Sequence, residues 1–174
     1  MLKLSIIDIL KNNTFGAVTG GLSQQEIVDI LGEPDDFEAN EGESYYNAKI
    51  WKYAGIEFHF ALQEKNKLTL FLIWNDTFEF LSDQSSSKKV KLDLDFIGRN
   101  NLIYKDLLNY FKLINLKYKV FRSKLSGSYF LHFESGAGLF LEEYDEETKP
   151  LMSSEVIAIQ AIVPFQNGSY EEII

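Results

Sequence analysis

The alternation of apolar and polar residues predicts a short helix early in the chain. Apolar residues recur every three or four positions over residues 24–31, which is the spacing of a helix with one buried face. Ser23 and Glu26 have the spacing of a capping box at its start. Gly32 and Pro34 predict its end, because glycine adopts the left-handed conformation found after helices and proline cannot continue one.

Antiparallel strands are predicted after this helix. Runs with strand character occupy residues 45–53, 56–62, 68–74 and 77–81. Within 56–62, isoleucine and phenylalanine alternate with polar residues, so one face of that strand is apolar. The segments between the runs have the length of turns, which favours hairpins over parallel crossovers.

A second helix and further strands are predicted beyond the polar segment 82–89, which we interpret as a linker. An amphipathic strand is expected at 90–96. An apolar stripe at 107–114 predicts a helix capped by Asn100 or Asn101. The strands predicted after it span residues 118–122, 129–134, 139–144 and 155–165.

The two halves of the chain share the order of helix, loop and antiparallel strands. The tripeptides Phe58-His59-Phe60 and Leu131-His132-Phe133 lie 73 residues apart and suggest an internal repeat. We therefore expect an α+β fold of two tandem modules, residues 1–84 and 85–174, each with a short helix or helices on an antiparallel sheet of three or four strands. The two sheets could join edge to edge into one. A single α+β domain with coincidental symmetry is the alternative.

Composition excludes several classes of protein. The 174 residues include no cysteine, which excludes a disulfide scaffold, thiolate catalysis and thiolate metal sites. The first ten residues are apolar but are interrupted by Asp8 and followed by no cleavage site, so we expect no secretory signal. No run approaches the roughly 18 apolar residues of a membrane span. We therefore expect a cytoplasmic protein that is not an enzyme, with no cofactor, metal or membrane partner.

Charge is distributed unevenly along the chain. The net charge is −9, which argues against a binder of nucleic-acid backbone, because such a protein needs the opposite charge. Residues 1–84 carry −8, residues 85–124 carry +7 and residues 125–174 carry −8. No base lies between Lys11 and Lys49, whereas eight acids do.

This acidic stretch is the leading candidate for a partner-binding surface. Its charge would attract a basic protein by long-range electrostatics, and nearby aromatic side chains would supply anchors for the interface core. The alternative, to which we give equal weight, is that these acids are simply solvated or are neutralised by bases of the same chain. The candidate residues are Asp35, Asp36, Glu38, Glu41, Glu43, Tyr45, Tyr46, Trp51 and Tyr53.

The two histidines suggest an alternative site. Residues two apart on a strand share a face, so Glu57 with His59 and His132 with Glu134 could each form an imidazole–carboxylate pair. Such a pair can act as a general base, and a sheet pocket around Glu57, His59 and His132 would then serve a small enzyme or a ligand-binding protein. The structural alternative is a strand histidine hydrogen-bonded to its neighbour without a chemical role, because no nucleophile or third ligand accompanies either pair.

A family resemblance spans residues 21–53. The string from Gly21 to Asp35, followed by Ile50-Trp51-Lys52-Tyr53, resembles the signature of the small outer-membrane assembly lipoproteins. Their helix-and-sheet module is shared with beta-lactamase inhibitory protein, which repeats it in tandem and binds its target through a concave sheet. The string also looks like that of small bacterial cytosolic proteins, some of them immunity proteins of toxin systems. The chain departs from the lipoproteins because it lacks a cysteine that could be lipidated.

The resemblance and the charge pattern together imply a protein-binding function. The leading hypothesis is an immunity protein that neutralises a cognate bacterial toxin by steric occlusion through its acidic, aromatic-rich surface. The alternatives are the histidine pocket described above and a purely structural or assembly module with an exposed sheet edge.

Overall fold

The computed structural model describes residues 2–62, 68–75, 90–93, 103–125, 127–141, 151, 156–161 and 170–173. Within these ranges it contains three α-helices, a short 3-10 helix (η1) and eleven strands. The helical elements are α1 (Ile6–Asn12), α2 (Gln24–Leu31), η1 (Tyr45–Asn47) and α4 (Tyr104–Leu113). The strands are β1 (Leu2–Ser5), β2 (Asp36–Glu38), β3 (Ile50–Tyr53), β4 (Ile56–Leu62), β5 (Leu68–Asn75), β6 (Val90–Asp93), β7 (Tyr118–Ser123), β8 (Tyr129–Phe133), β9 (Gly138–Leu141), β10 (Val156–Ala161) and β11 (Tyr170–Glu172).

Nine of these strands form one continuous antiparallel sheet. Its order is β11-β7-β8-β9-β10-β5-β4-β3-β2, so that each half of the chain contributes four neighbouring strands and β11 lies outside β7. The two groups meet where β10 pairs with β5, with Gln160 opposite Trp74. The predicted α+β fold of two sheet-based modules joined in one sheet is therefore confirmed.

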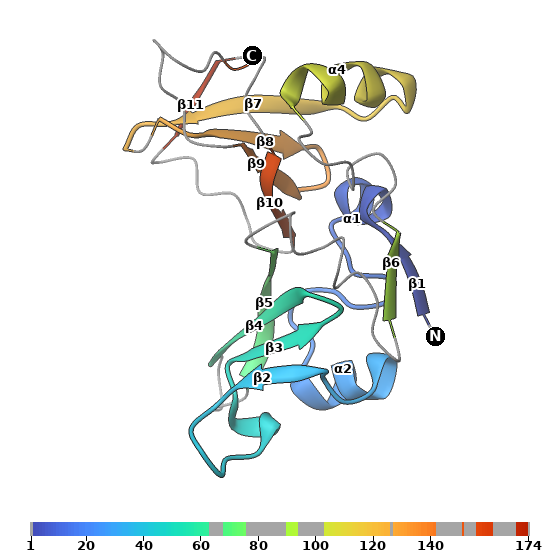
Figure 1. The fold of residues 1–174 in the computed structure, drawn as a ribbon, viewed down its shortest axis with the longest axis vertical. Helices are drawn as coiled ribbons and strands as arrows, with labels where there is room; N and C mark the ends of the chain where they lie inside the picture. Colours follow the sequence, from blue (N-terminus) through green and yellow to red (C-terminus); the bar gives the residue numbers. More distant parts are fainter. Residues whose placement is uncertain are drawn as a thin grey trace.

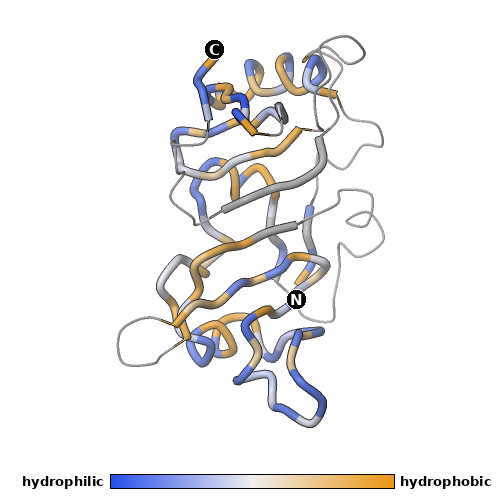
Figure 2. The backbone as a smooth tube through the Cα atoms, turned by 90° about the vertical axis from the view of Figure 1, so that its left-hand side faces the viewer, coloured by the Kyte–Doolittle hydropathy of each residue, from blue (hydrophilic) through white to orange (hydrophobic). Residues whose placement is uncertain are grey.

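The helices cover one face of this sheet. α4, α1 and α2 follow one another along the same side of the strands in Figure 1, and on the opposite side, seen in Figure 2, the described residues present strands. A separate two-stranded ribbon lies beside the helices, in which β1 pairs with β6 in parallel, Leu2 opposite Val90. The described part of the predicted strand at 90–96 is β6, and it pairs with the N-terminal strand β1 instead of joining the main sheet.

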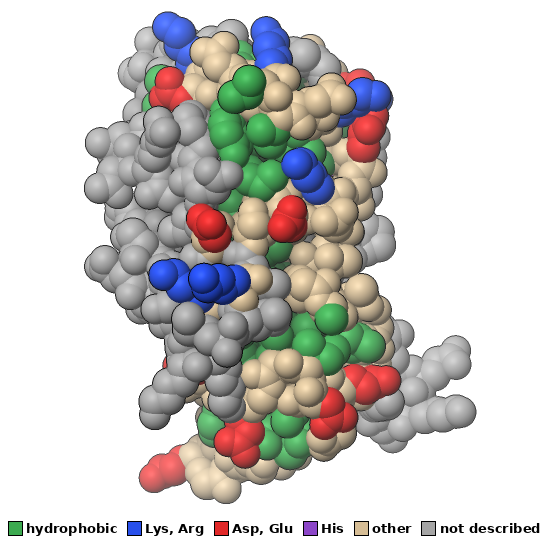
Figure 3. Space-filling model, turned by 90° about the vertical axis from the view of Figure 1, so that its right-hand side faces the viewer, with side chains coloured by type: hydrophobic (Ala, Val, Ile, Leu, Met, Phe, Trp, Pro, Cys, Tyr) green, Lys and Arg blue, Asp and Glu red, His purple; other side chains and the backbone are tan. Residues whose placement is uncertain are grey.

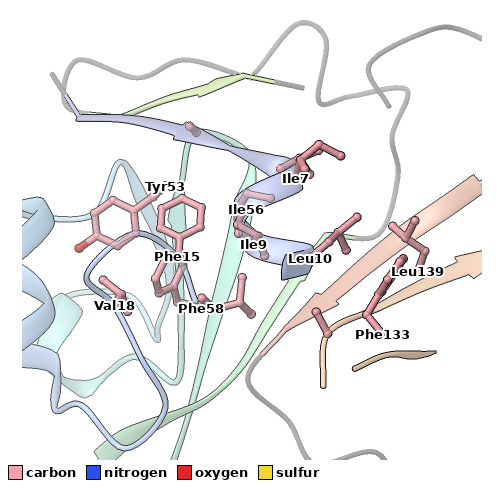
Figure 4. Packing of buried hydrophobic residues seen from close by; sticks show 14 of the residues in the cluster. Ile7, Ile9, Leu10, Phe15, Val18, Tyr53, Ile56, Phe58, Phe133 and Leu139 are labelled. Carbon is pink, nitrogen blue, oxygen red and sulfur yellow. The ribbon is translucent and has the colours of Figure 1, made fainter. Parts of the chain in front are cut away.

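Helix α1 packs where the two groups of strands meet. Figure 4 shows Ile9 beside Ile56 and Phe58 of β4, and Leu10 directed toward Leu139 of β9. All five side chains are at most 2% exposed and belong to one buried cluster that extends through both halves of the chain.

The C-terminal end of α1 is also tied to the second half by polar contacts. Ser135, in the β8–β9 turn, donates from its Oγ to the carbonyl of Leu10 at 2.5 Å. Gly136 in the same turn lies against Asn13, because a Cβ placed on this glycine would be 3.0 Å from the side-chain nitrogen Nδ2 of Asn13. The boundary predicted between residues 84 and 85 falls outside the described residues, but the contacts on either side of it make the two halves share one core.

Helix α2 begins and ends where the sequence predicts. The Ser23 side chain caps the amide of Glu26, and the Glu26 carboxylate accepts from the Ser23 amide at 2.8 Å, so the capping box is complete. Gly32 ends the helix with a φ of +81°, a conformation that favours glycine. Before the helix, Gly21 and Leu22 exchange backbone hydrogen bonds with Leu70, which attaches the start of α2 to β5.

Several predicted elements differ from the structure. The run 45–53 is a 3-10 turn followed by a short strand, because the Ser44 side chain caps the amide of Tyr46 and turns the chain. Helix α4 begins at Tyr104 after Ile103, which makes no side-chain cap, so the predicted asparagine cap is wrong. The apolar N-terminal run forms β1 and α1. The predicted strand at 77–81 and the linker at 82–89 lie outside the described residues.

The sheet also separates the two histidine tripeptides. His59 is on β4, one strand away from β5 at the junction, whereas His132 is on β8, two strands away from β10 at the same junction. The two strands therefore occupy different places in their groups. The two halves repeat the same order of strands. The offset of 73 residues between His59 and His132 nevertheless joins strands that are not equivalent in the two groups.

Candidate functional site: an acidic and aromatic end of the sheet

The predicted acidic residues lie at the end of the sheet formed by β2 and the loop that follows it. This loop is the lowest part of the fold in Figures 1 and 2 and projects beyond the strands. Asp35, Asp36, Glu38, Glu41 and Glu43 are all exposed. On the helix-covered face, acidic side chains gather at this lower end, and lysine and arginine are more frequent toward the α4 end (Figure 3).

Some of these acids also shape the loop. Asp35 accepts a hydrogen bond from the Ala54 amide at 3.1 Å and so holds the β3–β4 turn. Glu43 accepts from the Asn40 amide at 3.2 Å, which closes the tip of the loop. Glu41 is exposed without a hydrogen bond or ion pair among the described residues, so its charge faces solvent.

An aromatic cluster lies beside the acids. The rings of Tyr45 and Tyr46 are 4.4 Å apart, and Phe37 on β2 lies 6.1 Å from Tyr45. Phe37 is 38% exposed and Tyr46 is 37% exposed, so both rings present area to a partner. The hydrogen bond with Tyr46 raises the pKa of Tyr45 to about 12, so this phenol is neutral at physiological pH.

Trp51 and Tyr53 are not part of the exposed cluster, and their prediction as surface anchors is wrong. Both are 0% exposed. Trp51 donates from its indole nitrogen to the Tyr45 carbonyl at 2.8 Å, and Tyr53 donates from its hydroxyl to the Gly32 carbonyl at 2.7 Å. They alternate with Lys52 on β3 and therefore share the apolar face of the neighbouring strand β4. Their role is to hold η1 and the end of α2 against the sheet.

The open face of the same strands carries a row of charges. His59 lies 2.9 Å from the Glu57 carboxylate, as predicted from their spacing. Lys52 lies 3.3 Å from Glu57 and 3.5 Å from Glu38 across the neighbouring strands. Burial lowers the pKa of Lys52, but the hydrogen bonds and charges of the two glutamates outweigh it and raise that pKa overall. The row is an internally paired ladder across β2, β3 and β4.

His132 lies in a different environment on the same face. It stacks on Phe130 and contacts the edge of Phe121, each with ring centroids 6.0 Å away. Burial, together with the nearby charge of Lys119, lowers the pKa of His132 below its ordinary 6.5. Glu134 lies beyond the end of β8, where its carboxylate is 3.8 Å from Lys117.

The two histidines do not form one pocket. Three strands, β9, β10 and β5, separate β8 from β4. With neighbouring strands about 4.8 Å apart, this places the two histidine strands about 19 Å from each other. The predicted pocket around Glu57, His59 and His132 is therefore wrong.

The structure contains a groove that sequence reasoning missed. It is an open depression between the first turn of α2, η1 and the ends of β4 and β5. Its lining residues are Ser23, Gln24, Gln25, Glu26, Tyr46, Asn47, Lys49, Leu62 and Leu68. Tyr46 donates to the Gln25 side chain at 2.8 Å, which joins two of its walls. Leu62 has the same parity as the buried residues of β4 but is 60% exposed, because the strand continues beyond the core.

The described part of the chain contains neither a cluster of metal ligands nor a helix suited to spanning a membrane. No three histidine, aspartate or glutamate side chains there converge as metal ligands. No helix within the described ranges has the length and apolarity needed to cross a bilayer.

Comparisons with protein-family models, curated proteins and solved structures find no match for this chain. The functional argument therefore depends on the chemistry of the surface itself.

Proposed function

We propose that this protein binds a basic partner protein through its acidic and aromatic end. The observation that carries the proposal is the half-exposed Phe37–Tyr45–Tyr46 cluster, which lies next to exposed acids on a projecting loop. Acids of this kind accelerate encounter with a cationic protein, whereas aromatic rings supply most of the short-range binding energy. Trp51 supports the cluster from inside, so the rings are already ordered before a partner arrives.

The most specific form of this proposal is an immunity protein of the bacterial cytoplasm. Such a protein would cover the active surface of a cognate toxin and thereby block its substrate. Steric occlusion needs no catalytic group on the inhibitor, which suits a surface built from acids, tyrosines and a phenylalanine.

The test separates the contribution of the acids to the association rate from the contribution of the aromatic rings to the dissociation rate. The polypeptide encoded next to this chain's gene is produced in a bacterial host with or without this protein, and growth and association kinetics are measured. The variant Glu41→Lys/Glu43→Lys should slow association about tenfold at low salt, with a smaller effect at high salt, because exposed charges are screened. Tyr46→Ala should mainly accelerate dissociation.

Matched controls use exposed acids elsewhere. Glu134→Lys/Glu171→Lys makes the same change in net charge away from the acidic loop and should leave protection and association intact. If the Glu41/Glu43 variant protects cells and associates like the wild type, the steering proposal fails. If both double variants lost protection and association equally, the effect would come from net charge alone and the acidic loop would have no special role.

A further inference from the structure

The groove beside η1 contains a buried hydrogen-bond acceptor without a partner. Gln24 is 6% exposed, and its Nε2 donates to the Ala48 carbonyl at 2.7 Å. Its Oε1 accepts no hydrogen bond in the described part of the chain. A buried acceptor that has neither water nor a protein donor carries a desolvation penalty. The groove therefore favours an occupant whose N–H group donates to Gln24 Oε1.

The groove combines three apolar or aromatic side chains with polar ones, and acidic residues lie in it and in the loop beside it. Leu62, at 60% exposure, and Tyr46, at 37%, present apolar area to solvent, and Leu68 lies opposite Leu62 at the start of β5. Among the lining residues, Lys49 is the single base and Glu26 the single acid, and Glu41 and Glu43 belong to the loop that leads into η1. An apolar side chain next to a basic residue would therefore match the groove and its rim.

The opposite end of the molecule offers this combination. Leu125 is 90% exposed, the highest value for a large apolar side chain among the described residues. It lies in the β7–β8 turn directly after the exposed Lys124, and its amide is held by the Ser123 hydroxyl at 3.3 Å. In Figure 1 this turn is near the α4 end of the long axis, whereas η1 and α2 are at the other end.

We propose that the β7–β8 turn of one copy of this protein docks into the groove of a second copy. Leu125 would pack on Leu62 and Leu68, the Lys124 side chain would face the acidic loop, and the Lys124 backbone N–H would donate to Gln24 Oε1. The contact joins two different surfaces, so a pair of copies keeps one unused groove, on the copy that donates its turn, and one unused turn, on the other copy, and the association extends head to tail. A single turn covers less area than a standard interface, so the association is weak and dependent on salt.

Sedimentation velocity of the full chain tests this directly. From about 10 to about 500 µM protein at about 20 mM salt, the mean sedimentation coefficient should increase with concentration, and about 300 mM salt should reduce the increase. Leu62→Gln and Leu125→Gln should each weaken self-association at least about fivefold, since each removes one half of the apolar contact. Leu113→Gln, at another highly exposed leucine beside a lysine, is the matched control and should associate like the wild type.

Mixing the two defective variants makes the test decisive. The Leu62→Gln copy retains a working turn and the Leu125→Gln copy retains a working groove, so an equimolar mixture should form one-to-one dimers that grow no further. The proposal is overturned if the wild type stays monomeric throughout, if the mixture does not recover association, or if Leu113→Gln is the variant that abolishes it. Unchanged urea midpoints for the three variants show that the fold is intact.

Discussion

The close approach of Gly138 to Phe130 gives a sharp prediction about the open face of the sheet. A Cβ placed on Gly138 would lie 2.0 and 2.1 Å from two atoms of the Phe130 ring, far inside van der Waals contact. Phe130 is 2% exposed and packs on Phe140 at 4.5 Å between ring centroids, so its ring has little room to retreat. Gly138→Ala should therefore destabilise the protein through crowding of this one ring.

The expected loss is about 2–3 kcal/mol, at the upper part of the range for overpacked cores. Phe130→Ala alone should cost about 3 kcal/mol, as for other buried aromatic truncations. In the double variant the clash is absent, so Gly138→Ala should cost well under 1 kcal/mol, arising from the remaining 3.1 Å approach to the Leu131 carbonyl. The coupling between the two substitutions should thus be about 2 kcal/mol.

Urea unfolding followed by tryptophan fluorescence measures all four proteins of this cycle. Gly42→Ala is a useful comparison, because Gly42 has open space around it but a φ of +82°. It should cost about 1 kcal/mol from backbone conformation, whatever residue occupies position 130. The crowding explanation is refuted if Gly138→Ala costs the same with and without the Phe130 ring.

Three further predictions address the candidate site. Trp51→Ala should lower the free energy of unfolding by about 3–5 kcal/mol, whereas Tyr46→Ala should change it by about 0.5 kcal/mol or less, as chemical denaturation would show. Tyr53→Phe should cost about 1 kcal/mol by the same measurement, because it leaves the Gly32 carbonyl without its donor. NMR titration should give His132 a pKa below 6.5. Because the folded state resists protonation of this imidazole, the free energy of unfolding should fall as the pH decreases from about 6.5 toward the folded pKa. His132→Gln should remove this pH dependence.

Local signals explain which elements were predictable. The start and end of α2 follow from Ser23, Glu26 and Gly32, which act within a few residues of each other. The bounds of β4 follow from strict alternation over 56–62. By contrast, nothing within β1 indicates that it pairs with β6, since that pairing joins residues almost ninety positions apart. Such partners are selected by the tertiary fold.

The candidate site was predictable in its charge but not in its aromatic residues. Exposure of the acids around β2 follows from their number, because so many carboxylates cannot be buried. Alternation of Trp51 and Tyr53 with Lys52 already indicates a shared face with Phe58 on the next strand, and that signal would have placed both rings in the core. The groove required the fold, since Gln24 and Leu62 are neighbours in space alone.

The position of α1 has a consequence for how the chain folds during synthesis. Its apolar face is covered by strands from both halves, and its last turn is held by Ser135, about 125 residues later. A ribosome adds roughly 5–20 residues per second, so about 6 to 25 seconds pass after the synthesis of α1 before its final neighbours exist. Until then Leu10 lacks the strand that buries it, and a chaperone that holds this helix would protect the nascent chain from aggregation.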